Sequence, residues 1–533
     1  MVRIRIEIGR YWAVVVMIAL ASVSLSTAFA ECVDDPFPDK HCLEAVEFDA
    51  ALNGPPYPAS GVTLLSRIAV NEFPGDALAG ADLWGYVSPS GREYALMGLN
   101  SAIAFVDITE PEFPVIVEVI PHESAAQSDV KTFGEYAYAV TEGGGGLQVI
   151  DMTEIDNGIV TLVNTYVELG LDQAHNLAIN EDSGFAYICG SFDGRSDGGL
   201  FVLDLNPDPV NPTYAGAWRD AYVHDVQVVT YKQGPNAGRE IAFASSGLEG
   251  RGSPRLRIIG VSIKTNLWTI STADYPFAAF AHQAWLSEDK QRLFLNDEFD
   301  ERNAGIPTST KVFDVSDLEN PRYLSEISTG LPSTDHNLMV VGDILFEANY
   351  TSGLRILSIS EETFGEELGY FDTFPASDEV GFAGAWGVYA KFPSGTVIVS
   401  DIASGLFMLD VSQLVPKAVP PPNRGGGGGP CFIATAAYGT PLAEEIDALR
   451  TIRDEHLLNG AAGAAFVDFY YRVSPDLADH VRNHPLLAAL ARHAITVVLL
   501  IVHNSYLGFL ALAALVSTGC AILYRSVMRR GSC

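Results

Sequence analysis

A short apolar run that closes on a small or acidic residue recurs along this chain of 533 residues. Two copies are nearly identical, Gly199-Leu-Phe-Val-Leu-Asp204 and Gly405-Leu-Phe-Met-Leu-Asp410. Looser copies end at positions 107, 151, 260, 314 and 358. Successive copies lie 44 to 56 residues apart, and a period of that length indicates one small structural unit built seven times.

Each repeat divides into four short strand-like runs separated by turn-forming residues. In the sixth repeat the runs cover 336–341, 344–348, 353–357 and 368–371, and in the fifth they cover 282–286, 292–295, 310–314 and 322–327. Four strands at this period are typical of a β-propeller blade, whereas the domains of a β-sandwich array would be about twice as long.

The last repeat has no room for a fourth strand before Pro416, but an unassigned strand-like run covers 62–70 near the other end. Pairing these two segments would join the ends of the sheet and leave no open edge. The sequence therefore predicts an all-β fold, a seven-bladed β-propeller over residues 62–416 closed by an N-terminal strand. A small α-helical region and a transmembrane helix are predicted to follow it.

The aspartate that closes most of the runs precedes a turn-forming segment, as in Asp107-Ile-Thr-Glu-Pro111. An Asp side chain can accept a hydrogen bond from the backbone two residues on and so fix the turn into the outer strand. We therefore assign these aspartates a structural role rather than a catalytic one.

The runs GLFVLD, GLFMLD and KVFD resemble those of LVIVD-repeat propellers, and the layout resembles the "choice-of-anchor B" family of exported bacterial proteins. Segments 281–289 (AHQAWLSED) and 295–301 (LNDEFDE) are also similar to segments typical of that family. The resemblance covers roughly residues 60–415. It implies a propeller fold and an anchored, extracytoplasmic location, and it brings no settled activity.

The N-terminus has the features of a secretory signal peptide over residues 1–30, with a basic start, an apolar run and a small-x-small cleavage sequence at Ala28-Phe-Ala30. The segment 31–61 then contains Cys32 and Cys42, ten residues apart. A local disulfide suits an exported protein, and two free thiols are the alternative.

A Pro- and Gly-rich linker over 417–430 separates the propeller from the C-terminal region. Residues 431–485 begin with Cys431-Phe-Ile-Ala-Thr-Ala-Ala-Tyr-Gly439, which resembles the CFI-box of C-terminal sorting regions in exported bacterial proteins. By that analogy Cys431 is a processing or lipidation site. The alternative is a structural thiol in a small helical domain.

The last segment, 486–533, is predicted to be a membrane anchor. Residues 506–524 form an uncharged stretch of 19 residues, long enough to span a bilayer, and Arg525, Arg529 and Arg530 follow it. The positive-inside rule places those arginines in the cytoplasm and the propeller outside, on the extracytoplasmic face of a bacterial envelope membrane. The apolar helix at 486–502 would then lie in the interface, and a two-span hairpin is the alternative.

The composition excludes one class of partner. A formal charge of −34 and a pI near 4.5 argue against nucleic acid, whose phosphates require a basic surface. The usual enzyme signatures are also missing from the sequence, including G-x-S-x-G, H-E-x-x-H, the P-loop and the dinucleotide fingerprint.

One histidine recurs at the start of the first strand in four consecutive repeats, as His175, His224, His282 and His336, and Asp129 takes the same place in the second repeat. The first strand of a blade lines the channel, so these residues are expected to form a ring that suits a divalent transition metal. Three acidic neighbours are candidates for orienting the ligands: Asp225, Asp335 and Glu379. The alternative is that each histidine hydrogen-bonds the adjacent blade.

A second candidate is an acidic loop in the fifth repeat, formed by Asp297, Glu298, Asp300 and Glu301. Hard oxygen ligands in a loop suit calcium, although the spacing matches no EF-hand and a run of charges is more often a solvated face. A divalent metal, zinc or calcium, is therefore the cofactor that the sequence allows.

Three functions are consistent with these features. The favoured one is a membrane-anchored binding or scaffold module that presents the propeller to a protein, a glycan or a small ligand. The alternatives are a metal-dependent hydrolase or lyase that uses the histidine ring and a structural component of the cell envelope. Propellers host many unrelated functions, so fold alone does not decide among the three.

Overall fold

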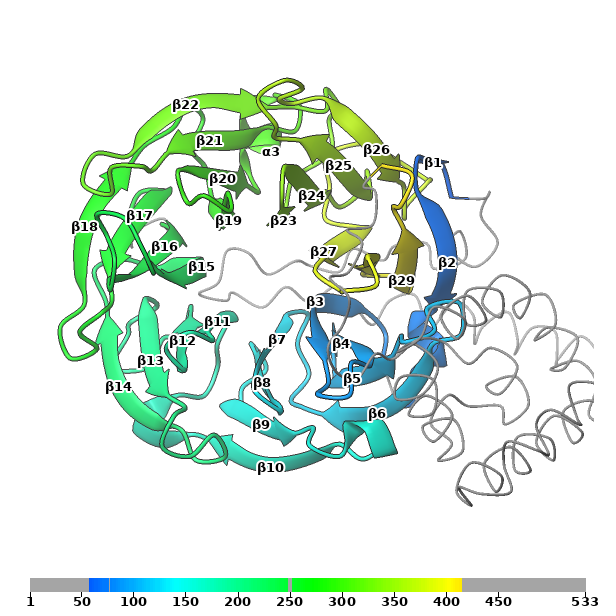
Figure 1. Cartoon of the computed structure of the whole chain (residues 1–533), viewed down its shortest axis with the longest axis horizontal. Helices are drawn as coiled ribbons and strands as arrows, with labels where there is room; N and C mark the ends of the chain where they lie inside the picture. Colours follow the sequence, from blue (N-terminus) through cyan, green and yellow to red (C-terminus); the bar gives the residue numbers. More distant parts are fainter. Residues whose placement is uncertain (1–56, 76, 248–251, 415–533) are drawn as a thin grey trace, which may run out of the picture.

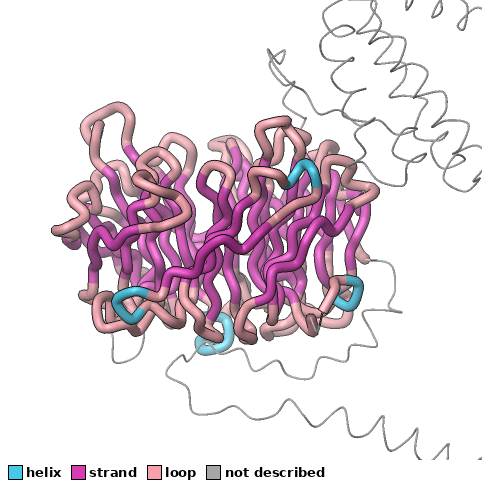
Figure 2. The backbone as a smooth tube through the Cα atoms, turned by 90° about the horizontal axis from the view of Figure 1, so that it is seen from below, coloured by secondary structure: helices cyan, strands magenta, loops and turns pink. Residues whose placement is uncertain are grey.

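The computed structural model describes residues 57–75, 77–247 and 252–414. Seven antiparallel sheets are arranged as blades around a central axis (Figure 1), and their strands run between two faces made of loops (Figure 2). The predicted seven-bladed β-propeller is confirmed.

The first four blades each contain four consecutive strands, ordered from the axis to the rim. Blade one consists of β3 (Gly80–Val87), β4 (Glu93–Leu99), β5 (Ala102–Asp107) and β6 (Val115–Pro121), and blade two of β7 (Ser128–Phe133), β8 (Tyr136–Thr141), β9 (Leu147–Asp151) and β10 (Thr161–Tyr166). Blade three consists of β11 (Asn176–Asn180), β12 (Phe185–Cys189), β13 (Leu200–Asp204) and β14 (Thr213–Trp218), and blade four of β15 (Val223–Thr230), β16 (Glu240–Ser246), β17 (Arg255–Gly260) and β18 (Trp268–Ala273).

The last three blades follow the same order, and blades six and seven also recruit the N-terminal strands. Blade five consists of β19 (Ala281–Leu286), β20 (Arg292–Asp297), β21 (Thr310–Asp314) and β22 (Arg322–Ile327). Blade six consists of β23 (Asn337–Val341), β24 (Ile344–Ala348), β25 (Leu354–Ser358) and β26 (Glu367–Phe371), with β1 (Ala59–Ser60) added at its rim. Blade seven consists of β27 (Ala385–Tyr389), β28 (Thr396–Asp401), β29 (Gly405–Asp410) and β2 (Thr63–Ile68).

The ring is closed by the N-terminal strand, as the sequence predicts. Strand β2 pairs antiparallel with β29, with Leu64 opposite Leu409 and Ile68 opposite Leu406. The outermost strand of blade seven therefore comes from the start of the propeller, which covers the edge of β29 that would otherwise be exposed. The short pairing of β1 with β26, with Ala59 opposite Phe371, extends this connection into blade six.

The recurring apolar run is the third strand of every blade. It lies between two other strands and has both faces packed against neighbouring blades, which explains why it is apolar throughout rather than alternating. In β13 the side chains of Leu200, Phe201, Val202 and Leu203 are all fully buried. Burial of one such side chain contributes about 1.5–3 kcal/mol, so the repeated run supplies much of the core.

The closing aspartates form the turn that the sequence predicts. Oδ1 of Asp107 accepts a hydrogen bond from the backbone N–H of Thr109 at 2.9 Å, and Oδ1 of Asp204 accepts one from Asn206 at 3.0 Å. Asp314 and Asp410 make the same contact with Ser316 and Ser412, at 3.0 and 2.9 Å. Their structural role is confirmed at these positions.

The described helices are short. They are α3 (Asp300–Ala304), which follows β20, and the 3-10 turns η1 (Val70–Glu72), η2 (Ile155–Asn157) and η3 (Glu168–Gly170). No helix within the described residues is both long and apolar enough to cross a bilayer.

Several predictions concern residues outside the described ones. They are the signal peptide at 1–30, the disulfide between Cys32 and Cys42 in 31–61, the linker at 417–430, the CFI-box region at 431–485 with Cys431, and the anchor at 486–533 with its span at 506–524.

Candidate functional site

The four recurring histidines lie where the innermost strands begin. His224 and His282 each sit in a break of the ladder register, between Val223 and Asp225 in blade four and between Ala281 and Gln283 in blade five. Such a bulge turns a side chain away from the regular alternation of the strand. His175 and His336 directly precede β11 and β23.

The four imidazoles form a continuous row of tilted rings from blade three to blade six. The ring centroids of His175 and His224, of His224 and His282, and of His282 and His336 are each 4.1 Å apart. The Tyr350 ring continues the row at 4.1 Å from His336. Among the described residues, the group that could share one ion contains only His282 and His336 of the four histidines, together with Glu298.

Each of three histidines is held in place by the backbone of the next blade. His224 Nδ1 donates to the carbonyl oxygen of His282 at 2.9 Å, and His282 Nδ1 donates to that of His336 at 3.2 Å. His336 Nδ1 donates to the carbonyl of Trp386 at 2.7 Å. Because a carbonyl only accepts hydrogen bonds, Nδ1 carries the proton, and Nε2 is the basic nitrogen of the neutral ring.

The contacts of the histidines bear on both alternatives, a structural role between blades and a role in metal binding. The contacts through Nδ1 join adjacent blades, as the structural alternative expects. The same contacts fix the tautomer and orientation of the rings, which is how histidines that bind metals are usually held.

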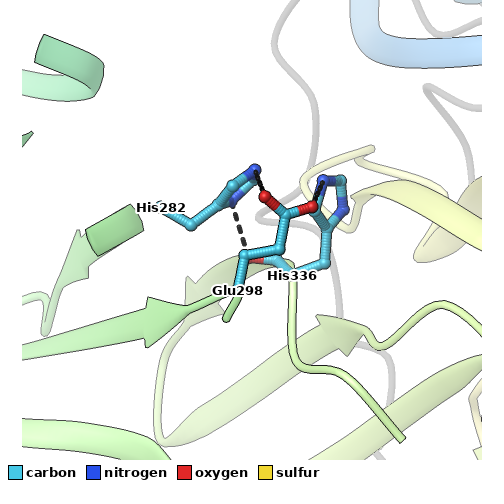
Figure 3. A group of neighbouring side chains, drawn as sticks. All are labelled: His282, Glu298 and His336. Atoms are coloured by element: carbon cyan, nitrogen blue, oxygen red, sulfur yellow. Dashed lines mark hydrogen bonds and ion pairs between the residues drawn. The ribbon is translucent and has the colours of Figure 1, made fainter. Parts of the chain in front are cut away.

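Glu298 brings two of these histidines together. It follows β20, and its carboxylate lies between the imidazoles of His282 and His336 (Figure 3). Oε2 is 3.8 Å from His282 Nε2, and Oε1 is 3.9 Å from His336 Nε2. The Tyr350 hydroxyl donates to Oε1 at 2.7 Å, which orients the carboxylate.

The spacing of these three groups suits a shared ion better than direct hydrogen bonds. Distances of 3.8 and 3.9 Å are too long for hydrogen bonds between nitrogen and oxygen. Two ligands of one zinc ion, each about 2.0–2.2 Å from it, lie roughly 3–4 Å apart. One potential ligand atom from each residue lies within 4.8 Å of the other two, and two histidines with one glutamate are a known zinc ligand set. We call His282, His336 and Glu298 the His–Glu centre.

The His–Glu centre is enclosed. His282 is 4% exposed, His336 is 1% exposed and Glu298 is fully buried. A buried carboxylate is costly unless a cation or hydrogen-bond donors compensate its charge, and the Tyr350 hydroxyl is one such donor.

The other histidine of the row and Asp129 have different partners. His175 Nδ1 lies 2.7 Å from Oε1 of Glu142, a residue in blade two that has no recognisable pattern in the sequence. Asp129 pairs with Lys131 and accepts a hydrogen bond from the backbone N–H of Leu177 at 3.0 Å. The structure thus places Asp129 in a contact between blades rather than beside Glu298.

The three acidic neighbours also have distinct positions. Asp225 accepts a hydrogen bond from Gln283 Nε2 at 2.7 Å, so it holds the residue that follows His282. Asp335 belongs to a separate carboxylate cluster. Glu379 is exposed, and its backbone oxygen accepts a hydrogen bond from the Thr351 hydroxyl at 2.8 Å.

The acidic loop of blade five is divided between two sites and one structural contact. Asp297 accepts hydrogen bonds from the Tyr275 hydroxyl at 2.7 Å and from the backbone of Phe280 at 2.8 Å. Glu298 belongs to the His–Glu centre, and Asp300 and Glu301 point into the carboxylate cluster with Asp335. The loop therefore does not gather around a single ion.

The carboxylate cluster consists of Asp300, Glu301 and Asp335. Burial, reinforced by the neighbouring carboxylates, raises the pKa of Glu301 and that of Asp335 well above their ordinary values. Burial opposes the charge of Lys311, but Asp335 and Asp300 more than offset it and raise the pKa of this ammonium. The cluster thus places three carboxyl groups beside one ammonium group, and the raised pKa values of Glu301 and Asp335 reflect the cost of charging all three.

A cavity of about 560 Å³ lies between the innermost strands of the blades. Gln283 and Asn337, the residues that follow His282 and His336, line it together with Trp84, Trp285 and Lys131. The lining contains both aromatic faces and charged groups, which is typical of a site for a small polar ligand.

Comparison with known proteins adds little to this description. No family model matches the chain, and no curated protein matches it. Among solved structures, a chain of hydrazine synthase from Kuenenia stuttgartiensis is similar with a TM-score of 0.44 at 12% sequence identity, over 64% of this chain and 98% of that one. A similarity of this degree carries no argument about activity.

Proposed function

We propose that this protein is a binding propeller that holds a divalent transition metal ion, preferably zinc, at the His–Glu centre. The ion joins blade five, through His282 and Glu298, to the start of blade six at His336. A bound ion with three protein ligands keeps a further coordination position for water or for a small ligand.

The observation that carries this proposal is the position of the Glu298 carboxylate between two imidazole nitrogens, at 3.8 and 3.9 Å. The Nδ1 contacts with His336 and Trp386 support it, because they leave Nε2 of each ring basic and directed at the carboxylate. Two nitrogens and one carboxylate oxygen suit zinc, whereas calcium and magnesium prefer oxygen alone.

The cavity between the innermost strands supports a role in binding a small ligand. Gln283 and Asn337, which follow the two histidine ligands in the sequence, line it. The burial of the His–Glu centre restricts access to small groups rather than to the chain of a large substrate.

Hydrolysis is the second candidate, and the ligand count is what favours it. Catalytic zinc sites keep three protein ligands and one open position, and zinc lowers the pKa of water bound there to about 7. In such a reaction Tyr350 would hold the Glu298 carboxylate through its hydroxyl group. Binding remains the primary proposal, because the centre is enclosed.

The placement outside the cytoplasm is part of the proposal and is supported by the sequence alone. The signal-like segment 1–30, the span at 506–524 with its following arginines, and the resemblance to LVIVD-repeat and choice-of-anchor B proteins all favour a propeller held on the outer face of a membrane. There it would meet a protein or glycan partner. Fractionation of bacteria that express the tagged chain tests this, and recovery of the protein in the cytosol contradicts it.

Metal analysis of the purified full-length protein tests the main proposal. We expect close to one zinc ion per chain in the wild type and loss of most of it in the double variant His282→Ala/His336→Ala and in Glu298→Gln. His122→Ala is the control, since His122 bonds Glu123 of its own segment and should leave the metal content unchanged. Zinc retained by both site variants, or absent from the wild type after zinc loading, would contradict the proposal.

A further inference from the structure

A second group of potential ligands lies next to the His–Glu centre and contains only oxygen donors. Asp300 and Glu301 belong to α3, and Asp335 precedes His336, so the carboxylate cluster joins blade five to blade six. One oxygen from each residue lies within 4.8 Å of the other two, and none of the three side chains is more than 1% exposed. Glu298 thus lies two residues before α3, and Asp335 directly precedes His336.

The hydrogen bonds to this cluster leave part of each carboxylate unsatisfied. Among the described residues, Oδ1 of Asp300, Oε2 of Glu301 and Oδ1 of Asp335 are buried and have no hydrogen-bond partner. A buried carboxylate oxygen without a partner is costly unless a proton or a cation compensates its charge.

The other oxygen of each carboxylate has a protein partner, which fixes its direction. Asp300 Oδ2 accepts from Lys311 Nζ at 2.5 Å, and Asp335 Oδ2 accepts from the backbone N–H of Ser309 at 3.1 Å. Glu301 Oε1 accepts from the backbone N–H of Asp335 at 3.3 Å. These contacts leave the three unpartnered oxygens for a ligand.

The charges within the cluster do not cancel. Lys311 forms an ion pair with Asp300, and its ammonium also contacts the carbonyl of Ser309. One ammonium group offsets one of three carboxylates, so Glu301 and Asp335 require either protons or a divalent cation.

We propose that Asp300, Glu301 and Asp335 bind a calcium ion. Calcium prefers carboxylate and other oxygen ligands, and its charge matches the two carboxylates that Lys311 leaves uncompensated. This ligand set differs from the acidic loop expected from the sequence. Asp335 takes part in it, whereas Asp297 and Glu298 do not.

The position of this site gives the ion a structural role. Calcium would tie α3, which begins two residues after Glu298, to the segment before β23, which carries His336. The calcium site does not depend on the proposed function, because it shares no ligand with the His–Glu centre.

Thermal unfolding with added calcium tests the proposal on the full-length protein. After removal of metals with a chelator, we expect about 1 mM Ca²⁺ to raise the Tm of the wild type by about 3 °C or more, because binding to the folded state alone stabilises it. Glu301→Gln and Asp335→Asn should lose this increase. Their Tm without calcium should equal or exceed that of the wild type, since each change removes a buried charge.

Two controls separate this site from other effects. Glu379→Gln removes an exposed carboxylate and should keep the full calcium response. Glu298→Gln should keep the calcium response while losing zinc, so failure of one site is distinguishable from failure of the other. A wild type whose Tm is unchanged by calcium would overturn the proposal, because the carboxylates would then be neutralised by protons, and a response to Mg²⁺ alone would overturn the choice of calcium.

Discussion

The hydroxyl group of Tyr350 donates a hydrogen bond to Oε1 of Glu298 at 2.7 Å, across the boundary between blades six and five. The same tyrosine ring contacts the His336 ring in a tilted arrangement with a centroid distance of 4.1 Å. One side chain therefore positions two of the three groups of the His–Glu centre.

Replacement of this hydroxyl should weaken metal binding without disturbing the fold. We expect Tyr350→Phe to reduce zinc affinity about 10-fold, as is typical when a residue that orients a metal ligand is lost. Competition with a chromogenic chelator measures the affinity. Tyr94→Phe is the matched control, because Tyr94 also donates to a carboxylate at 2.7 Å, that of Asp156, outside the centre. Equal effects of the two changes would show that Tyr350 contributes only to stability.

The carboxylate of Asp82 should make stability depend on pH. Burial raises the pKa of Asp82 from 3.8 to about 7, although Lys131 acts in the opposite direction. Between these values the folded protein keeps a proton that the unfolded chain has released. The free energy of unfolding should therefore decrease as pH rises from about 4 to 7. Above pH 7 both states have released the proton, so Asp82 should cause no further change.

Comparison with Asp82→Asn isolates this contribution. The stability of the wild type relative to the variant should be greatest near pH 4 and should fall by pH 8, as measured by urea unfolding. Glu379→Gln, at an exposed position, should show a constant difference from the wild type across the same range. A difference for Asp82→Asn that rises with pH would contradict the assigned direction.

Closure of the ring should depend on the core of blade seven. Phe407 is fully buried in β29, and its ring lies 5.1 Å from that of Tyr57 and 5.6 Å from that of Phe371. We expect Phe407→Ala to lower the free energy of unfolding by about 3–5 kcal/mol, because it removes a large core side chain. Phe277→Ala, at a position 59% exposed, should change it by less than about 0.5 kcal/mol. Similar effects of the two substitutions in urea unfolding would refute this.

Most of the fold could be predicted because the repeat encodes it several times. The apolar third strand is buried on both faces, so its composition is recognisable in each copy, and the following aspartate marks the turn. The closing strand β2 followed from counting strands. Strand β1 has only two residues, Ala59 and Ser60, and such a short edge pairing has no pattern in the sequence.

The candidate site was predictable only in part. The recurrence of the histidines identifies the ends of the innermost strands. A linear sequence does not show that bulges in two of these strands help to place the rings in one row. Glu298 was grouped with its acidic neighbours, because spacing along the chain cannot show that successive residues after β20 point to different sites. Glu142 and Tyr350 approach from other strands and blades, and their contacts depend on the packing of the ring.

X-ray absorption at the zinc edge tests the central claim most directly, using the full-length protein loaded with one equivalent of zinc. The structure predicts a first shell of nitrogen and oxygen atoms at about 2.0–2.2 Å that includes two imidazoles, with one imidazole lost in His336→Ala. A shell that contains sulfur at about 2.3 Å, or one that His336→Ala leaves unchanged, would show that zinc binds elsewhere and would contradict the assignment of the His–Glu centre.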